Sequence, residues 1–107
     1  MKKLILAVTL VAASFTAQAS WITELSDYKL VDKTIFSVQC ADVMEDNGQF
    51  VAMGHYNTFV TMFSKEVLSR NIKSEFITSV KKKLYDGKSK AISRLCFSHA
   101  AEYKYLR

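Results

Sequence analysis

Apolar residues recur at helical spacing over most of the chain, and the clearest run extends from residue 49 to about residue 69. Its apolar positions follow one another at intervals of four, three, four and four residues: Ala52, Tyr56, Phe59, Phe63 and Val67. Three more apolar residues widen this stripe: Met53, Val60 and Met62. A period of this kind predicts a long amphipathic helix with one buried face.

Two shorter helices are predicted after this one. The first starts near Asn71, stops at Asp86 and Gly87, and carries apolar residues four apart: Ile72, Phe76, Val80 and Leu84. Gly87 marks the turn, because glycine commonly follows the C-terminal end of a helix. Ser89 is a candidate N-cap for the last helix. One face of that helix carries a further set: Ile92, Leu95, Cys96, His99, Tyr103 and Leu106.

The pattern is weaker between residues 20 and 48. The β-branched and aromatic residues 34–39 favour an extended segment, which leads into a short helix that begins at Cys40 and ends near Gly48. Residues 20–39 are therefore a candidate N-terminal arm, although residues 20–33 also show a weak helical period. The chain has no proline and only 3 glycines, which favours helices. We expect an all-α fold, a small single-domain bundle of about four helices.

The first 19 residues have the layout of a secretory signal peptide. Lys2 and Lys3 precede an apolar run of about ten residues, and Ala17-Gln18-Ala19 forms a small-x-small cleavage site. The run is too short to span a bilayer. We expect cleavage between Ala19 and Ser20, which leaves 88 of the 107 residues as one periplasmic or secreted domain. We also expect no stable membrane insertion after the signal is removed.

Removal of the signal peptide lowers the formal net charge from +5 to +3, because Lys2 and Lys3 are lost. Residues 20–64 carry two lysines and six acidic residues, whereas residues 65–107 carry eleven basic and four acidic residues. Part of this basic excess is a candidate binding patch: Lys81, Lys82, Lys83, Lys88 and Lys90. These lysines either offset the dipole of a helix end or attract an acidic partner or an anionic lipid surface. The net charge is too small to indicate a nucleic-acid partner.

Both cysteines, Cys40 and Cys96, follow the signal peptide, and an exported protein reaches a compartment in which thiols are oxidised. We expect them to form one disulfide bond, which would close a loop of 57 residues and contribute about 4 kcal/mol of stability. The alternative is a metal site, because Cys96 and His99 are three residues apart and His55 and Asp42 could add ligands. No second paired motif supports that site, so we expect no metal and no cofactor.

Few residues could carry catalytic chemistry. His55 and His99 are the only histidines, and each lies on or beside an apolar stripe, which favours a structural role. Both are also candidate pH sensors, since histidine titrates near neutral pH. Three acidic residues gather near a predicted helix end without further sign of a glycosidase pair: Asp42, Glu45 and Asp46. The chain lacks a phosphate loop, a CxxC motif and a nucleophile elbow, so we expect no enzymatic activity.

An aromatic-rich helix face that its neighbours cannot cover would leave an exposed apolar patch, which favours a binding function. The residues from Cys40 to Met44, followed by Phe50 and then Gly54 and His55, resemble the start of the HdeA/HdeB family of periplasmic acid-stress chaperones. The segment from Ile92 to Cys96, part of an apolar helix that carries the partner cysteine, is a second point of similarity. The resemblance covers roughly residues 40–96. It implies a small helical domain, stapled by the Cys40–Cys96 disulfide, that loosens in acid and holds unfolding client proteins.

Two non-enzymatic functions remain open. The first is this chaperone function, with unfolded client proteins of the cell envelope as partners. It is favoured if His55 or His99 is buried in its neutral form, because the need to protonate it would destabilise the fold in acid. The second is a periplasmic inhibitor or immunity protein, for example a phage-encoded one, that binds a lysozyme-like enzyme or a toxin. The uneven charge favours this second function, and a homodimer is compatible with either.

Overall fold

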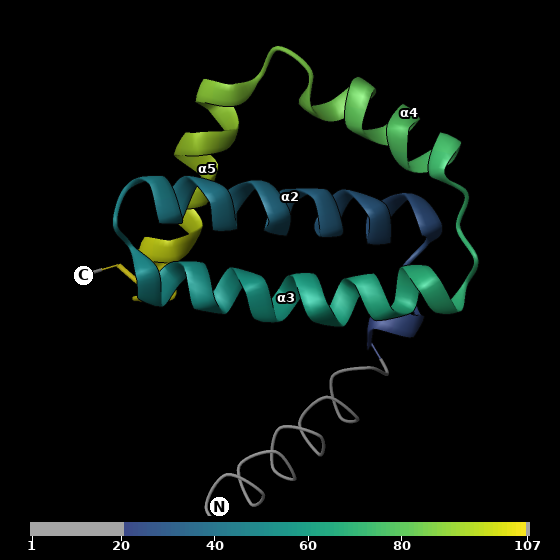
Figure 1. Cartoon of the computed structure of the whole chain (residues 1–107), viewed down its shortest axis with the longest axis horizontal. Coiled ribbons are helices and arrows are strands. Elements are labelled where there is room, and N and C mark those ends of the chain that lie inside the picture. The colour runs from purple at the N-terminus through teal and green to yellow at the C-terminus, as the bar shows by residue number, and fades with distance from the viewer. Residues whose placement is uncertain (1–20, 107) are drawn as a thin grey trace, which may run out of the picture.

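The computed structural model of the chain describes residues 21–106 (Figure 1). A short helical stretch at residues 21–23 precedes four helices: α2 Asp27–Asp46, α3 Phe50–Ser69, α4 Ser74–Tyr85 and α5 Ser89–Glu102. No strand occurs in the described range. The expected all-α bundle of about four helices is therefore confirmed. The expected signal peptide, with its cleavage site between Ala19 and Ser20, lies outside the described residues.

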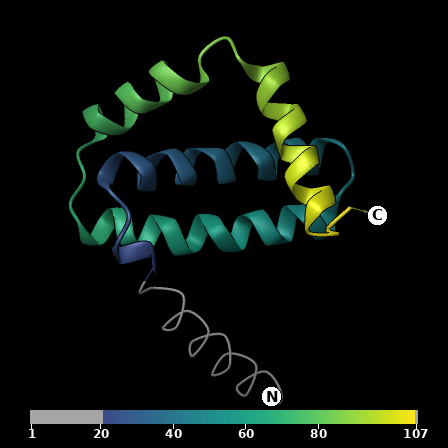
Figure 2. The same ribbon diagram turned by 180° about the vertical axis from the view of Figure 1, so that it is seen from behind.

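Helices α2 and α3 form an antiparallel hairpin, and α2 also packs against α4 and α5. Figure 2 shows α5 crossing one end of the hairpin, while α4 runs beside the other end of α2. The described chain starts near one end of α3 and finishes near the other end (Figure 1). Helix α2 is therefore the central element, to which the other three helices attach.

Each of these four helices is followed by a residue in the left-handed backbone conformation. These residues are Gly48, Asn71, Gly87 and Lys104, with φ angles of 71°, 53°, 72° and 59°. Gly48 and Gly87 stop α2 and α4 as the sequence predicts, because glycine adopts this conformation without steric cost. Asn71 lies two residues after the end of α3, whereas the sequence predicted the start of the next helix there. Lys104 has a Cβ atom and adopts the same conformation under strain.

The core consists of two clusters of buried side chains. The larger cluster surrounds Cys40 and Cys96, which are fully buried and joined by a disulfide with their Cα atoms 5.2 Å apart. All four helices contribute to it, for example through Met44, Tyr56, Val80 and Ile92. The smaller cluster consists of Ile22, Leu30, Met62 and Phe63. The predicted disulfide is thus confirmed, and it ties the central helix to the last one.

The prediction of an extended segment at residues 34–39 is wrong, because these residues lie in the middle of α2. Helix α2 begins at Asp27, where the Ser26 side chain caps it by accepting a hydrogen bond from the Lys29 N–H. Residues 27–39 therefore belong to the central helix and not to an N-terminal arm, and only residues 21–26 precede it in the described chain. β-Propensities span about 1 kcal/mol, and the packing of α2 against three helices outweighs them.

The buried faces of α4 and α5 agree only in part with the predicted ones: Val80, Ile92 and Cys96 are buried as expected. In α4, Ile77 packs against the larger cluster, whereas Phe76 is 37% exposed. In α5, Ala100 is buried and Leu95 is 55% exposed. Ser89 is the first helical residue of α5 rather than its N-cap. The sequence thus predicts both helices and part of their buried faces, but packing decides which other side chains face the core.

Candidate functional site

A pocket of about 460 Å³ opens on the hairpin where α2, α3 and the C-terminal end of α5 meet. Aromatic side chains from distant parts of the chain form most of its wall: Trp21, Phe36, Tyr56, Phe59, Phe63, Tyr103 and Tyr105. Within residues 21–106, four further residues line it: Asp32, Lys33, Ser37 and His99. The pocket combines an aromatic surface with one carboxylate, one ammonium group and one imidazole.

The aromatic rings hold one another in place through edge and face contacts. Trp21 stands edge-on to Phe63 with ring centroids 5.8 Å apart, and Phe63 stacks on Phe59 at 6.1 Å. Phe36 stands edge-on to Tyr56 at 6.4 Å and to His99 at 6.1 Å. Aromatic pairs favour these geometries because of the ring quadrupole. The rings therefore fix the shape of the wall largely by packing.

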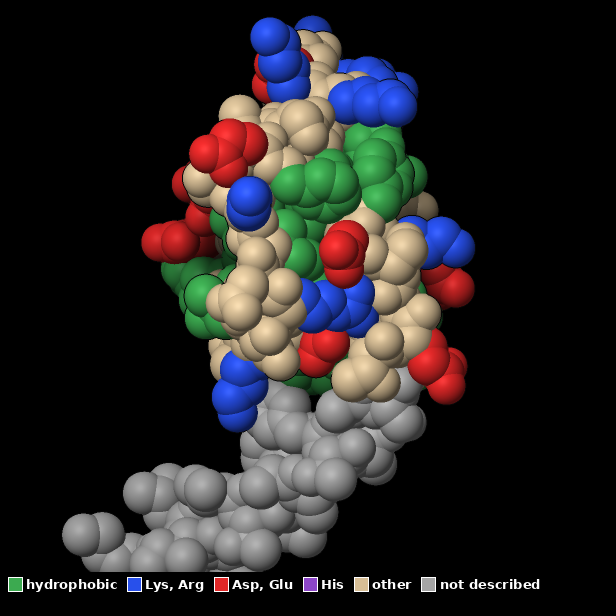
Figure 3. Space-filling view, turned by 90° about the vertical axis from the view of Figure 1, so that its right-hand side faces the viewer, with side chains coloured by type: hydrophobic (Ala, Val, Ile, Leu, Met, Phe, Trp, Pro, Cys, Tyr) green, Lys and Arg blue, Asp and Glu red, His purple; other side chains and the backbone are tan. Residues whose placement is uncertain are grey.

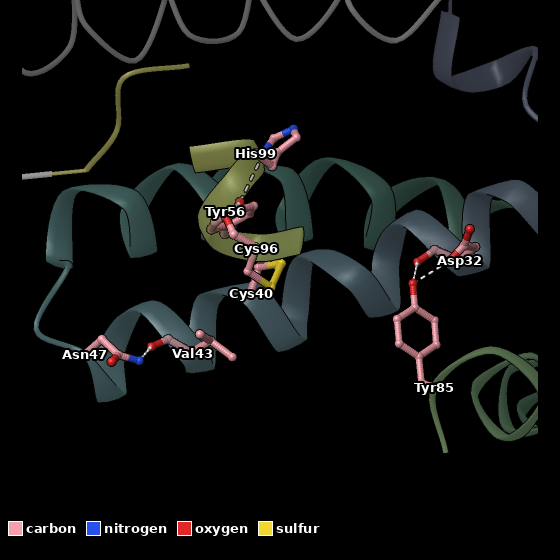
Figure 4. The surroundings of a disulfide bond; sticks show 8 residues. All are labelled: Asp32, Cys40, Val43, Asn47, Tyr56, Tyr85, Cys96 and His99. Carbon is pink, nitrogen blue, oxygen red and sulfur yellow. Dashed lines mark hydrogen bonds between the residues drawn. A yellow bond between two sulfur atoms is a disulfide. The ribbon is translucent and has the colours of Figure 1, made fainter. Parts of the chain in front are cut away.

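Tyr56 links the pocket to the disulfide (Figure 4). Its side chain is 1% exposed, and its hydroxyl donates to the carbonyl oxygen of Cys96 at 2.7 Å. The same hydroxyl lies 3.1 Å from Nδ1 of His99. Because the only hydroxyl hydrogen goes to the carbonyl, we assign the hydrogen of the second bond to Nδ1 of His99. Burial, with a smaller contribution from Tyr105, raises the pKa of Tyr56 to about 12.

His99 is held in its neutral form at neutral pH. Burial lowers the pKa of its imidazole below the ordinary value of 6.5, and Lys33 adds to this effect, while Glu102 opposes it. Its bonded partner Tyr56 stays protonated, so the pair offers neither a strong base nor an activated nucleophile. The arrangement is suited to binding and to sensing acid.

The two charged side chains of the pocket wall, Asp32 and Lys33, differ in their contacts. Asp32 accepts hydrogen bonds from the Tyr85 hydroxyl through its carboxylate and, at 3.0 Å, through its backbone carbonyl (Figure 4). Burial and this carboxylate raise the pKa of Tyr85. Lys33 is exposed and makes no ion pair within the described part of the chain. Neither charged side chain of the wall has an ion pair in this range, but the Asp32 carboxylate is directed to the Tyr85 hydroxyl on α4, whereas the Lys33 ammonium group has no hydrogen-bond partner among the described residues.

The second candidate pH sensor, His55, lies at the same end of the molecule as His99. Its exposed ring stacks on Tyr105, with centroids 3.7 Å apart and planes 8° from parallel. Tyr105 in turn stacks on Tyr103, and Tyr103 contacts His99. Both histidines therefore contact the tyrosines that follow or end α5, although they are 44 residues apart in the sequence.

The candidate basic patch forms part of the exposed surface of the molecule. All five lysines are exposed, on α4, on the turn that follows it and on the first turn of α5: Lys81, Lys82, Lys83, Lys88 and Lys90. Figure 3 shows basic side chains gathered at the end of the molecule that carries this region. Lys83 lies 5.9 Å from the ring centroid of Tyr28, and none of the five lysines forms an ion pair among residues 21–106. This surface is separate from the residues that line the pocket.

The sequence did not predict a cluster of contacts around Arg70, the residue that follows α3. Its guanidinium donates to Glu66 Oε2 at 2.8 Å and to Asp27 Oδ1 at 2.9 Å, and these carboxylates raise its pKa. It also donates to the carbonyl oxygens of Leu25 at 2.7 Å and of Ile22 and Thr23 at 3.1 Å each. We call this set of five hydrogen bonds the Arg70 clamp. Of these contacts, only the ion pair between Glu66 and Arg70 could be predicted from the sequence, because residues four apart are neighbours on a helix.

The Arg70 clamp fastens residues 21–26, which we call the N-terminal strap, against α3. Ile22 of the strap is 4% exposed and packs with Leu30, Met62 and Phe63 in the smaller core cluster. Trp21, the single tryptophan of the chain, packs on Phe63 beside it. The strap therefore covers apolar side chains of the hairpin that would otherwise reach the surface.

Comparisons with known proteins leave the family open. No protein-family model matches this chain, no curated protein is detectably similar to it, and no solved structure matches its fold. Within residues 21–106, no three side chains of the metal-ligating types His, Cys, Asp and Glu come together. In the same range no helix has the length and apolar character needed to span a membrane.

Proposed function

We propose that this protein is exported to the cell envelope, lacks enzymatic activity, and holds unfolding client proteins in acid, as the resemblance to the HdeA/HdeB family implies. The observation that carries the proposal is the Arg70 clamp. Two of its five acceptors are the carboxylates of Asp27 and Glu66, and it holds the N-terminal strap over an apolar cluster. An acid-sensitive fastening above apolar surface is what acid-activated holding requires.

The expected sequence of events starts with the carboxylates. The ion pairs of Arg70 last only while its partner carboxylates are charged, and strong acid removes carboxylate charge. Arg70 then loses both ion pairs and keeps only its three carbonyl acceptors. The strap loosens, and Leu30, Met62 and Phe63 become accessible to apolar segments of a client.

His99 acts in the same direction at higher pH. Because its folded-state pKa lies below that of the unfolded chain, the unfolded chain binds more protons between the two values. The stability it contributes is complete above the unfolded pKa and declines as the pH falls through the folded pKa. Acid therefore weakens the contact between α3 and α5 in addition to the strap.

The proposal is tested by following the strap and client aggregation together. At about pH 3 we expect the Trp21 emission to shift to longer wavelength and the near-ultraviolet circular dichroism to fall. The protein should then suppress light scattering by an acid-unfolded enzyme such as citrate synthase, which it should not do at neutral pH. Retention of the native spectra at about pH 3, or scattering unaffected by the protein, would sink the proposal.

A charge-neutral variant tests whether the clamp is the acid-sensitive element. Asp27→Asn with Glu66→Gln should give the loosened strap and part of the client holding at neutral pH. The matched control is Asp42→Asn with Glu45→Gln, which removes two exposed carboxylates of α2 that make no ion pair in the described chain. Equal behaviour of both double variants would show that the clamp carboxylates are not the trigger.

The alternative function is a periplasmic inhibitor or immunity protein that binds a lysozyme-like enzyme or a toxin, and the exposed basic patch favours it. A glycosidase cleft of this type contains two carboxylates, to which lysine side chains are complementary. Under this alternative, Lys81→Gln, Lys82→Gln and Lys83→Gln together should abolish inhibition of the enzyme. The protein should also keep its native spectra at about pH 3, the opposite of the result expected for the chaperone.

A further inference from the structure

We infer that the aromatic pocket between α2, α3 and α5 is a binding site for a small aromatic anion, whose rings lie between the aromatic side chains and whose charged group faces Lys33. This inference goes beyond the proposed function. It concerns a small molecule bound to the folded protein at neutral pH, whereas client holding concerns the loosened protein in acid.

The size and surface of the pocket indicate an aromatic ligand. Its volume of about 460 Å³ lies within the range of small-molecule sites. Phe36 and Phe59 come from the two helices of the hairpin, and Trp21 and Tyr103 reach the pocket from opposite ends of the described chain. Rings in these positions offer both faces and edges to a flat guest, and such contacts add to the gain from apolar burial. A ligand of two or three rings fits these dimensions.

The charges of the wall indicate the sign of the ligand. Among the described residues, Asp32 is the only carboxylate that lines the pocket, and its oxygen is directed to the Tyr85 hydroxyl on α4. Lys33 lines the pocket on α2 and makes no ion pair among the described residues. An aromatic cage can also hold a cation, but a cation here would be repelled by the ammonium group of Lys33. The unmatched cation therefore favours an anionic group such as a carboxylate, sulfonate or phosphate.

We expect binding of the ligand to be coupled to protonation of the His99 imidazole. The groups around it are Lys33 from α2, Tyr56 from α3, and Glu102 and Tyr103 at the end of α5. An anion placed beside Lys33 would offset the effect of that ammonium group on the imidazole, so binding should raise the pKa of His99. By linkage, the ligand should then bind more tightly as the pH falls from about 7 to about 5.5.

A pair of fluorescent probes tests the inference. Anilinonaphthalene sulfonate is an aromatic anion, and N-phenylnaphthylamine has the same rings without the sulfonate. At about pH 7 we expect one molecule of either probe to bind the folded protein and quench Trp21, which lines the pocket. The two probes should compete with each other.

The variant Lys33→Gln separates the contribution of the ammonium group to binding from that of the aromatic side chains. This variant should weaken the sulfonate probe about three- to fivefold, as expected for one partly solvated ion pair, and leave the neutral probe unchanged. The control Lys29→Gln removes an exposed lysine one turn earlier on α2, outside the pocket lining, and should change neither affinity. Far-ultraviolet circular dichroism checks that both variants are folded.

Several results would overturn the inference: no binding of either probe to the wild-type protein at about pH 7, a Lys33→Gln variant that binds the sulfonate as well as Lys29→Gln does, or an equal loss for both probes. Failure of the client-holding assay in acid would leave this result intact, because the probes are bound to the native protein at neutral pH. The two conclusions can therefore be rejected separately.

Discussion

Replacement of Arg70 by Met removes the guanidinium that fastens the N-terminal strap to α3 and keeps most of the aliphatic side chain. The guanidinium has three carbonyl and two carboxylate acceptors. We expect about 0.5 kcal/mol from each carbonyl bond, the low end of the usual range because solvent reaches the side chain, and about 0.5 kcal/mol from each ion pair. The variant should lose about 2.5 kcal/mol of unfolding free energy, of which about 1 kcal/mol is the part that acid also removes.

Two measurements separate the strap from the whole fold. Urea unfolding followed by far-ultraviolet circular dichroism gives the global loss, which corresponds to a fall in Tm of about 10 to 20 °C for a domain of this size. Trp21 emission at neutral pH reports the strap itself, since Trp21 is the only tryptophan and packs on Phe63. We expect its emission to shift to longer wavelength in Arg70→Met while the helical content is kept.

Lys65→Met is the matched control, because Lys65 is exposed on the same helix and makes no ion pair among the described residues. It should change stability by less than about 0.5 kcal/mol, as most surface substitutions do. If Arg70→Met stays within about 0.5 kcal/mol of Lys65→Met and Trp21 keeps its native emission, the clamp does not hold the strap.

Three further predictions concern the disulfide, the buried histidine and the strained end of α5. Cys40→Ala with Cys96→Ala should cost about 4 kcal/mol, measured by urea unfolding, and a smaller loss than about 2 kcal/mol would contradict the loop-closure argument. His99→Gln should flatten the decline in stability between about pH 7 and about pH 5, because the lowered pKa of His99 makes the wild type lose stability as the pH falls. If the slope of stability against pH is unchanged in the variant, groups other than His99 cause the decline. Lys104→Gly should raise the unfolding free energy by about 0.5 kcal/mol, because glycine adopts the φ of 59° without strain, and a fall in Tm would be the opposite result.

The sequence predicted the features that depend on local spacing or on a single pairing. The apolar period of α3 placed its ends within one residue of residues 49 and 69, and Gly48 and Gly87 marked the turns that follow α2 and α4. The Cys40–Cys96 bond followed from the presence of only two cysteines. Each of these depends on chemistry that does not require the positions of other helices.

The remaining features depend on contacts between residues far apart in the chain. Residues 34–39 favour strands locally, yet they are helical because α2 gains burial from three neighbours at once. The candidate site is a similar case: His99 and Tyr56 are 43 residues apart, and the sequence showed each as an apolar-face residue without showing that they bond. The pocket draws its rings from both ends of the described chain, so no single helical stripe could reveal it.

By itself, then, the sequence determined that this chain forms helices, where most of them stop, and which two cysteines join. The helix period and the turn residues act over short range, and two cysteines allow only one intramolecular pairing. Only the tertiary structure decided which faces are buried, that Arg70 fastens the strap, and that Lys33 remains unmatched beside an aromatic pocket. The physical reason is that burial and charge pairing are properties of the assembled bundle, in which residues separated by 40 or more positions supply each other's environment.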